Sequence, residues 1–291
     1  MKYYWIFIIV IFLFSCEKNI DFKLDESAPT LVVEAVIENG MPPSVTLTKS
    51  IPYFSEISTQ MLMNSFVREA KVYISNGTFT DTLKEYDVPL APGYFFHYYS
   101  IDTSAMHAGI IGELNTTYQL RIVAEGKEYL STTRIPGNDV RIDSLYFKPA
   151  PFDPDSNKRI MYLKATDPKG LGNYLRYFTK KNAGPFLPGP NSVYTDEVVD
   201  GTTFTVQLEP GVNRNDPSKP DDNFFRASDT VTLKFCNISK STYSFWNTWE
   251  FANQAIGNPF SQPNKVLDNI SNGALGAFCG YASAYRTIIV E

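Results

Sequence analysis

The stretch VREAKVYISNGTFTDTL, Val67–Leu83, decides the fold class of this chain. Two runs rich in β-branched and aromatic residues, Val67–Ser75 and Thr78–Leu83, flank the dipeptide Asn76-Gly77. This dipeptide favours a two-residue type I′ turn, because both central positions of that turn need a positive φ. The stretch therefore predicts an antiparallel β-hairpin in a mainly β protein.

Strand-like segments continue on both sides of the hairpin, over residues 29–136. Thr117–Ala124 alternates between apolar and polar residues, and a Glu-Gly turn leads from it into Glu128–Arg134. Segment 55–66 lacks strand character and is expected to be a short helix or an excursion. About seven short strands over roughly 105 residues predict an immunoglobulin-like or fibronectin-like β-sandwich. Its other strands are expected at Thr30–Ile37, Val45–Ser50 and Gly93–Ser100.

The segment Ile135–Asp139, with Pro and Gly, marks the expected start of a second domain, residues 137–291. This domain is expected to be β-rich and to contain one amphipathic helix near residues 239–256. Ser239 can cap this helix, because its hydroxyl can accept a hydrogen bond from a free amide of the first turn. Strands are expected at Val140–Phe147, Arg159–Thr166, Asn173–Lys180, Thr202–Leu208 and Thr230–Cys236, followed by a final pair at Gly276–Tyr281 and Ala284–Val290.

The N-terminus has the layout of a secretory signal peptide, with Lys2 before the apolar run Tyr3–Phe14. The run is too short for a membrane-spanning helix, which needs about 20 apolar residues. It leads into the tetrapeptide LFSC, which ends at Cys16 and resembles the bacterial lipobox. We therefore expect residues 1–15 to be a lipoprotein signal peptide, Cys16 to carry the lipid, and residues 16–28 to form a tether. The alternative is an ordinary signal peptide with an incidental cysteine.

Composition agrees with an exported globular protein and excludes one class of partner. Of 291 residues, 43% are hydrophobic and 14% aromatic, which is enough for a large core, and the net charge is −5. An acidic chain without a basic patch does not favour nucleic acid. Two further cysteines, Cys236 and Cys279, could form a disulfide in an oxidising envelope. We expect the bridge, with two buried free thiols as the alternative.

Several short motifs also occur in a shared order over nearly the whole chain. After the lipobox cysteine they are Leu31–Ala35, Asn39-Gly40, Pro42-Pro43, Val45–Thr48, Ser239–Tyr243, Asn258–Phe260, Asn269-Ile270 and Gly273–Phe278. Their order resembles a family of Bacteroidota lipoproteins, catalogued as domain of unknown function 4249. The resemblance implies an envelope lipoprotein, often associated with TonB-dependent outer-membrane receptors, without established catalytic residues. The family often has aromatic residues where this chain has Ala277 and Cys279, so the resemblance does not imply the disulfide.

No motif typical of a zinc hydrolase, a dithiol enzyme or a serine hydrolase occurs, and we expect no cofactor and no metal. Of the two histidines, His97 and His107, the first lies in an aromatic strand and is expected to be structural. Asp153–Asn157 resembles the start of a calcium loop, but lysines stand where the EF-hand pattern needs Gly and Glu. The residues Asp216, Asp221 and Asp222 are expected to lie in a solvated loop. The less favoured alternative is that these three aspartates form a looser calcium site.

Three aromatic residues are candidates for stacking against a flat ligand: Tyr98, Trp246 and Trp249. Core packing is the default for all three, because a strand and an amphipathic helix must each bury one face. The leading hypothesis is a non-enzymatic accessory lipoprotein of the outer membrane, facing the cell surface or the periplasm. It would work beside a TonB-dependent receptor in nutrient capture or envelope assembly. The alternatives are a glycan- or peptide-binding module acting alone and, more weakly, a carboxylate-based hydrolase.

Overall fold

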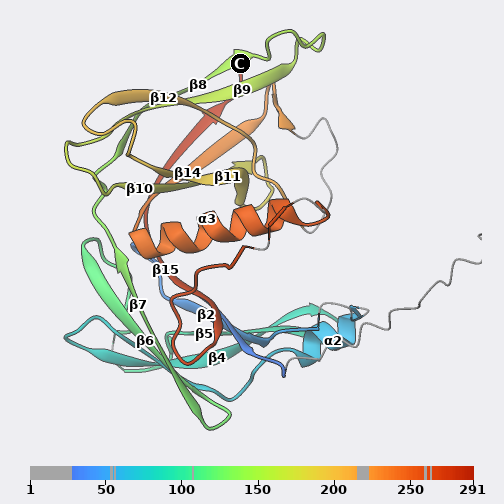
Figure 1. Cartoon of the computed structure of the whole chain (residues 1–291), viewed down its shortest axis with the longest axis vertical. Coiled ribbons are helices and arrows are strands. Elements are labelled where there is room, and N and C mark those ends of the chain that lie inside the picture. Colours follow the sequence, from blue (N-terminus) through green and yellow to red (C-terminus); the bar gives the residue numbers. More distant parts are fainter. Residues whose placement is uncertain are drawn as a thin grey trace, which may run out of the picture.

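The computed structural model describes residues 28–52, 55, 57–106, 108–214, 223–258, 261–262 and 264–291. The expected signal peptide, Cys16, most of the expected tether, His107 and the three loop aspartates at 216–222 lie outside the described residues. The described chain is mainly β, as predicted, and forms two β-sandwiches joined through one long strand (Figure 1).

The first sandwich is built from the strands of the N-terminal half. Its core contains alternate residues of these strands, including Val33, Val72 and Leu120, which are fully or almost fully buried. A short helix, α2 (Thr59–Asn64), occupies the segment where a helix or excursion was expected. The strands are β1 (Leu31–Glu38), β2 (Ser44–Lys49), β3 (Lys71–Ser75), β4 (Thr80–Ala91), β5 (Tyr94–Ser100), β6 (Thr116–Ala124) and β7 (Lys127–Ile135).

The predicted hairpin is confirmed as β3 and β4, but its turn is longer than expected. Ser75 pairs with Thr80, so the loop comprises residues 76–79. The side chain of Asn76 accepts hydrogen bonds from the amides of Thr78 and Phe79, at 3.1 and 2.9 Å. A type I′ turn would need a positive φ at both Asn76 and Gly77. In the observed turn, which the Asn76 side chain stabilises, only Gly77 of these two residues has a positive φ.

The second sandwich places two sheets face to face around a separate core. One sheet contains β10, β11, β14 and the C-terminal half of β15, and the other contains β8, β9, β12 and β13. The predictions missed β11, because its sequence LPGPNSVYT contains two prolines and a glycine. The strands are β8 (Arg141–Pro149), β9 (Lys158–Thr166), β10 (Tyr174–Lys181), β11 (Leu187–Thr195), β12 (Thr203–Leu208), β13 (Phe225–Arg226), β14 (Thr230–Ile238) and β15 (Leu275–Ile289).

Strand β15 corrects two expectations. It is one continuous strand of 15 residues rather than a pair of strands, because Ala282 and Ser283 are buried in the sheet instead of forming a turn. Its first half pairs with β1 in parallel and its second half pairs with β14 in antiparallel fashion. Residues 137–291 therefore do not form a separate domain, since Phe278 and Ala282 complete the core of the first sandwich.

Three asparagine side chains fix this joint by imitating the backbone of a neighbouring strand. Asn39 accepts from the amide of Ser283 at 2.6 Å and donates to its carbonyl at 3.4 Å. Asn269 bonds Phe278 in the same two ways, both at 2.8 Å. Asn237 bonds Val140, at 3.0 and 3.1 Å. Each pair satisfies a backbone donor and acceptor, which are costly to leave unpaired when buried.

Helix α3 (Lys240–Ala255) covers the outer face of the sheet that β10, β14 and β15 form (Figure 1). Ser239 caps it as predicted, because its hydroxyl accepts from the amide of Thr242 at 3.3 Å. The buried residues of α3 include the charged Glu250, whereas Ile256, just past the end of the helix, is exposed. Within the part of the chain that the structure describes, no helix is long and apolar enough to cross a membrane.

The expected disulfide between Cys236 and Cys279 is wrong. Both cysteines are buried free thiols on the side of the sheet that faces α3. In the register of the sheet Cys236 lies opposite Ser283, four positions along β15 from Cys279. Four residues of a strand span about 13 Å, whereas bridged cysteines need Cα atoms within about 7 Å.

Candidate functional site

A cavity of about 860 Å³ lies between α3 and the sheet, where the two sandwiches join. Strands β1 and β15 form one wall and α3 forms another, while β10, β14 and three further segments, 186–188, 212–214 and 266–268, contribute the remaining lining. The volume is within the range of cavities that bind small molecules, about 300–1,000 Å³.

The lining is mainly apolar, because every second side chain of a strand points to the same face. On β1, Val33 belongs to the closed core although it also borders the cavity, while Val32 and Val36 line the cavity without belonging to that core. On β15, Phe278 enters that core, whereas Cys279 lines the cavity. The wall formed by α3 is aromatic and contains Phe245, Trp246 and Trp249.

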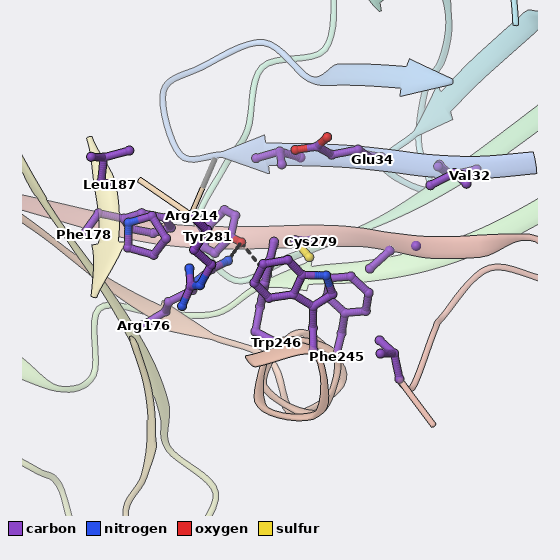
Figure 2. A pocket seen from close by; sticks show the side chains of 18 of the residues that line it. Val32, Glu34, Arg176, Phe178, Leu187, Arg214, Phe245, Trp246, Cys279 and Tyr281 are labelled. Carbon is purple, nitrogen blue, oxygen red and sulfur yellow. Dashed lines mark hydrogen bonds between the residues drawn. The ribbon is translucent and has the colours of Figure 1, made fainter. Parts of the chain in front are cut away.

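A buried arginine, Arg176 of β10, lies at the polar centre of the cavity (Figure 2). Only 2% of its surface is exposed. Its Nη1 donates to the hydroxyl of Tyr281 at 2.8 Å, and its Nε donates to Oγ of Ser192 at 3.1 Å. The indole of Trp246 donates to the same Tyr281 hydroxyl at 2.8 Å, and the guanidinium lies 3.5 Å from the centroid of that indole. All of these direct contacts are with neutral groups.

A second arginine, Arg214, shares one carboxylate with this network. Glu250 of α3 accepts hydrogen bonds from the amide and the hydroxyl of Ser192, and lies 3.7 Å from Nη2 of Arg214. Burial lowers the pKa of Arg214, and the charge of Arg176 lowers it further, against the opposing effect of Glu250. Two guanidinium groups thus face one buried carboxylate. An anionic group in the cavity would balance the remaining positive charge, which is costly to bury alone.

The other charged groups of the cavity do not supply this balance. Lys234 forms an ion pair with Glu38, which also accepts a hydrogen bond from Tyr285. Glu34 and Asp268 line the cavity but are exposed, so water and salt screen their charges. In Figure 2, Val32 and Glu34 lie on β1, across the cavity from Arg176 and Trp246.

The structure brings together only part of the residues that the sequence singled out. Trp246 and Trp249 line the cavity, but Tyr98 lies on β5 of the first sandwich, where it stacks with Tyr86 at 5.6 Å between ring centroids. Of the two cysteines, Cys279 lines the cavity and Cys236 does not.

The sequence predictions missed three residues of the polar centre: Arg176, Arg214 and Glu250. The sequence did carry one sign of them. Arg176 interrupts an otherwise apolar and aromatic run, LRYF, in a strand with both faces covered. A charged side chain in such a strand requires a polar partner on one face. Its partner Ser192 follows 16 positions later, and Glu250, which accepts from Ser192, follows 74 positions later, so no local pattern connects them to Arg176.

Fold and cavity together define a class of protein: a mainly β, double-sandwich protein with a cavity of about 860 Å³ at the joint. Within this class, the family model described as Domain of unknown function (DUF4249) matches residues 17–287, so the chain belongs to that family. The domain family that the ordered motifs suggested is thereby confirmed. A comparison with curated proteins gives no match.

Proposed function

We propose that this protein is a non-enzymatic lipoprotein of the bacterial envelope that captures a small ligand in the cavity under α3. The ligand carries one anionic group, a carboxylate, sulfonate or phosphate, and an apolar or aromatic body. The observation that carries the proposal is Arg176, a buried cation without a direct carboxylate partner, in an aromatic-lined cavity of about 860 Å³. An arginine suits such a ligand, because its planar fork binds carboxylate and phosphate groups in a bidentate manner.

The protonation states of the lining favour binding over nucleophilic catalysis. Burial raises the pKa of the Cys279 thiol to about 11, so that it stays protonated near neutral pH. Burial also raises the pKa of Tyr281 well above its ordinary value, despite the opposing charge of Arg176. A nucleophile or general base needs a pKa close to the working pH. These groups are therefore suited to hold a ligand rather than to attack it.

Two fluorescent probes with nearly the same aromatic body test the anionic preference. The sulfonate 1-anilinonaphthalene-8-sulfonate should bind the purified full chain more tightly than the neutral N-phenyl-1-naphthylamine. Arg214→Gln should weaken the sulfonate probe by about 10-fold or more, since a hydrogen bond to a charged group contributes about 1.5–3 kcal/mol. The neutral probe should be unaffected.

The matched control is Arg121→Gln, which removes an exposed arginine of β6 that pairs with Glu128 outside the cavity. It should leave the binding of both probes unchanged. Trp249→Ala, in contrast, should weaken both probes, because it removes part of the aromatic wall. Equal binding of the two probes by the native protein, or an equal loss in the Arg121 and Arg214 variants, would contradict the proposal.

The anchoring part of the proposal rests on Cys16, the lipobox-like position of the sequence. Cys16→Ser should abolish lipid attachment, because serine lacks the thiolate that accepts the diacylglycerol. Metabolic labelling with a clickable palmitate analogue, followed by membrane fractionation, measures this loss. Equal labelling of the native chain and the variant would show that another residue is the acceptor. Protease treatment of intact cells then separates the cell surface from the periplasmic face.

The proposal includes a partner, a TonB-dependent outer-membrane receptor, to which the captured ligand would pass. Its support is the lipobox and the association implied by the ordered motifs of the sequence. Extraction in mild detergent should then copurify the lipoprotein with an outer-membrane β-barrel protein. Recovery of the lipoprotein alone from native membranes, with its cavity still binding the sulfonate probe, would favour the second candidate, a binding module acting by itself.

A further inference from the structure

Three aspartates from two loops converge at one end of the second sandwich. Asp167 follows β9, while Asp196 and Asp200 lie in the loop between β11 and β12. Each offers one carboxylate oxygen, and these three oxygens lie within 4.8 Å of one another. The cluster is separate from the cavity, since none of the three residues lines it.

Backbone amides hold each of these carboxylates in place by one oxygen. The amide of Gly201 donates to Oδ2 of Asp167 at 3.1 Å. The amides of Gly172 and Asn173 both donate to Oδ2 of Asp196, each at 2.8 Å. The amide of Gly170 donates to Oδ1 of Asp200 at 2.6 Å. The loops are thus arranged to present carboxylates to one another, although like charges repel.

One oxygen in this cluster has no partner. Asp167 is 2% exposed, and its Oδ1 is buried without a hydrogen bond. A buried polar atom without a partner is rare in folded proteins and indicates a missing water, ion or ligand. Burial raises the pKa of Asp167, and the charges of Asp196 and Asp200 add to this effect, against the lowering by the Gly201 amide and the side chain of Asn173.

A second cluster, Glu85, Asp87 and His97, differs because its carboxylates form ion pairs with a basic residue of the protein. Arg68 donates to Glu85 at 2.7 Å and to Asp87 at 3.1 Å, and His97 contacts Asp87 at 2.6 Å. A cation of the protein, Arg68, therefore pairs with both carboxylates of this cluster. Among the described residues, no lysine, arginine or histidine forms an ion pair with any of the three aspartates at 167, 196 and 200.

We propose that Asp167, Asp196 and Asp200 bind a calcium ion. Three carboxylates, one of them buried and lacking a partner, provide the hard oxygen donors and the negative charge that Ca²⁺ selects. Ca²⁺ accepts irregular geometry and six to eight oxygens, so that water or loop carbonyls can complete its shell. Mg²⁺ demands a near-octahedral shell at shorter distances, which a group of residues fixed by separate loop amides is less suited to supply.

The position of the cluster gives the ion a structural role. Asp167 directly follows β9, which pairs with β12 in one sheet, and Asp196 directly follows β11, which pairs with β10 in the facing sheet. An ion held by both loops would clasp the two sheets at this end of the sandwich. It would also relieve the repulsion among the three carboxylates.

Calorimetric titration and thermal unfolding of the full chain in mild detergent, after removal of divalent ions with EGTA, test the site. With a dissociation constant of about 1 mM, typical of weak extracellular sites, about 10 mM CaCl₂ should raise Tm by roughly 3 °C. Asp200→Asn changes an exposed residue and should weaken Ca²⁺ binding at least tenfold without preventing folding. Asp167→Asn should raise Tm in the absence of Ca²⁺, because it removes a buried charge, and should abolish the response to Ca²⁺.

The matched control is Asp87→Asn, which makes the same change in the cluster whose carboxylates pair with Arg68. It should keep the full response to Ca²⁺. Three results would overturn the site: no heat and no Tm shift in the native chain, an equal shift with NaCl at the same ionic strength, or an undiminished response in both the Asp167 and the Asp200 variants.

Discussion

The two faces of β15 border two different environments. One face, with Phe278 and Ala282, belongs to a closed apolar core. The other face, with Cys279 and Tyr281, borders a cavity of about 860 Å³ whose centre is a buried arginine. The same strand therefore supports a tightly packed region and a hollow one, separated by a single backbone.

The comparison indicates that the closed core contributes more to the stability of the fold than the cavity side does. The core of the first sandwich carries apolar contacts on every strand, and the hydroxyls of Tyr99 and Tyr118 have partners, such as the Glu113 amide, which donates to Tyr118 at 2.7 Å. The cavity face keeps an unbalanced positive charge and open volume instead. Regions that depart from local packing rules in this way are often functional sites.

The largest expected effect compares phenylalanines from the two regions. Phe278→Ala should reduce the free energy of unfolding by about 3–5 kcal/mol, because it leaves a cavity in a closed core. Phe178→Ala, on the cavity side, should cost less than about half of this, since Phe178 is only partly buried. Urea unfolding followed by circular dichroism measures both. Equal losses would show that the cavity side is as closed as the core.

A smaller and sharper comparison uses neighbouring valines of β1. Val33 is fully buried in the core, whereas Val32 lines the cavity. Val33→Ala should lower the free energy of unfolding by about 2 kcal/mol, and Val32→Ala by less than about 0.5 kcal/mol. Thermal unfolding of the two variants side by side checks the difference. A larger loss for Val32→Ala would reverse the assignment of the two faces.

The smallest expected effect concerns the thiols. Burial raises the pKa of Cys236 and of Cys279 to about 11, from an ordinary value of 9.0. Unfolded thiols ionise before the folded ones, so the native state loses stability as the pH rises from about 9 to about 11. Below pH 8.5 the total loss should stay under about 0.5 kcal/mol.

Iodoacetamide at pH 8 should therefore label neither Cys236 nor Cys279 in the native protein. Both should react in denaturant without a reductant, because they are free thiols. Mass spectrometry of the labelled peptides counts them. Labelling that requires a reductant would reveal the disulfide that the register of the sheet excludes.

Local patterns predicted the parts of this fold that are locally determined. The hairpin around Asn76 and the helix capped by Ser239 depend on contacts within a few residues, and both are confirmed in kind. Strand β11 escaped prediction because prolines and a glycine lower its local strand propensity, while pairing with β10 supplies its stability. The continuity of β15 escaped because small residues at 282–284 resemble a turn but pair with β14.

The site was less predictable for the same reason. The aromatic residues of α3 stood out as an apolar face, but nothing local indicated that a cavity separates them from β1. The asparagine clamps at Asn39, Asn237 and Asn269 likewise depend on partners far along the chain. Among them, Asn39 and Asn269 belong to the ordered motifs that suggested the family, although the motif alone does not reveal the strand that they bind.

The parallel pairing of β1 with β15 also sets the order of events during folding. Asn39 and Ser283, which bond at this joint, are 244 residues apart in sequence. The first strand to be synthesised therefore waits with one exposed edge until the last strand arrives, and contacts of such long range form slowly. A chain that emerges from a ribosome or a membrane channel in sequence order cannot close its first sandwich midway. The native state of the first sandwich therefore forms only once β15 is available to pair with β1.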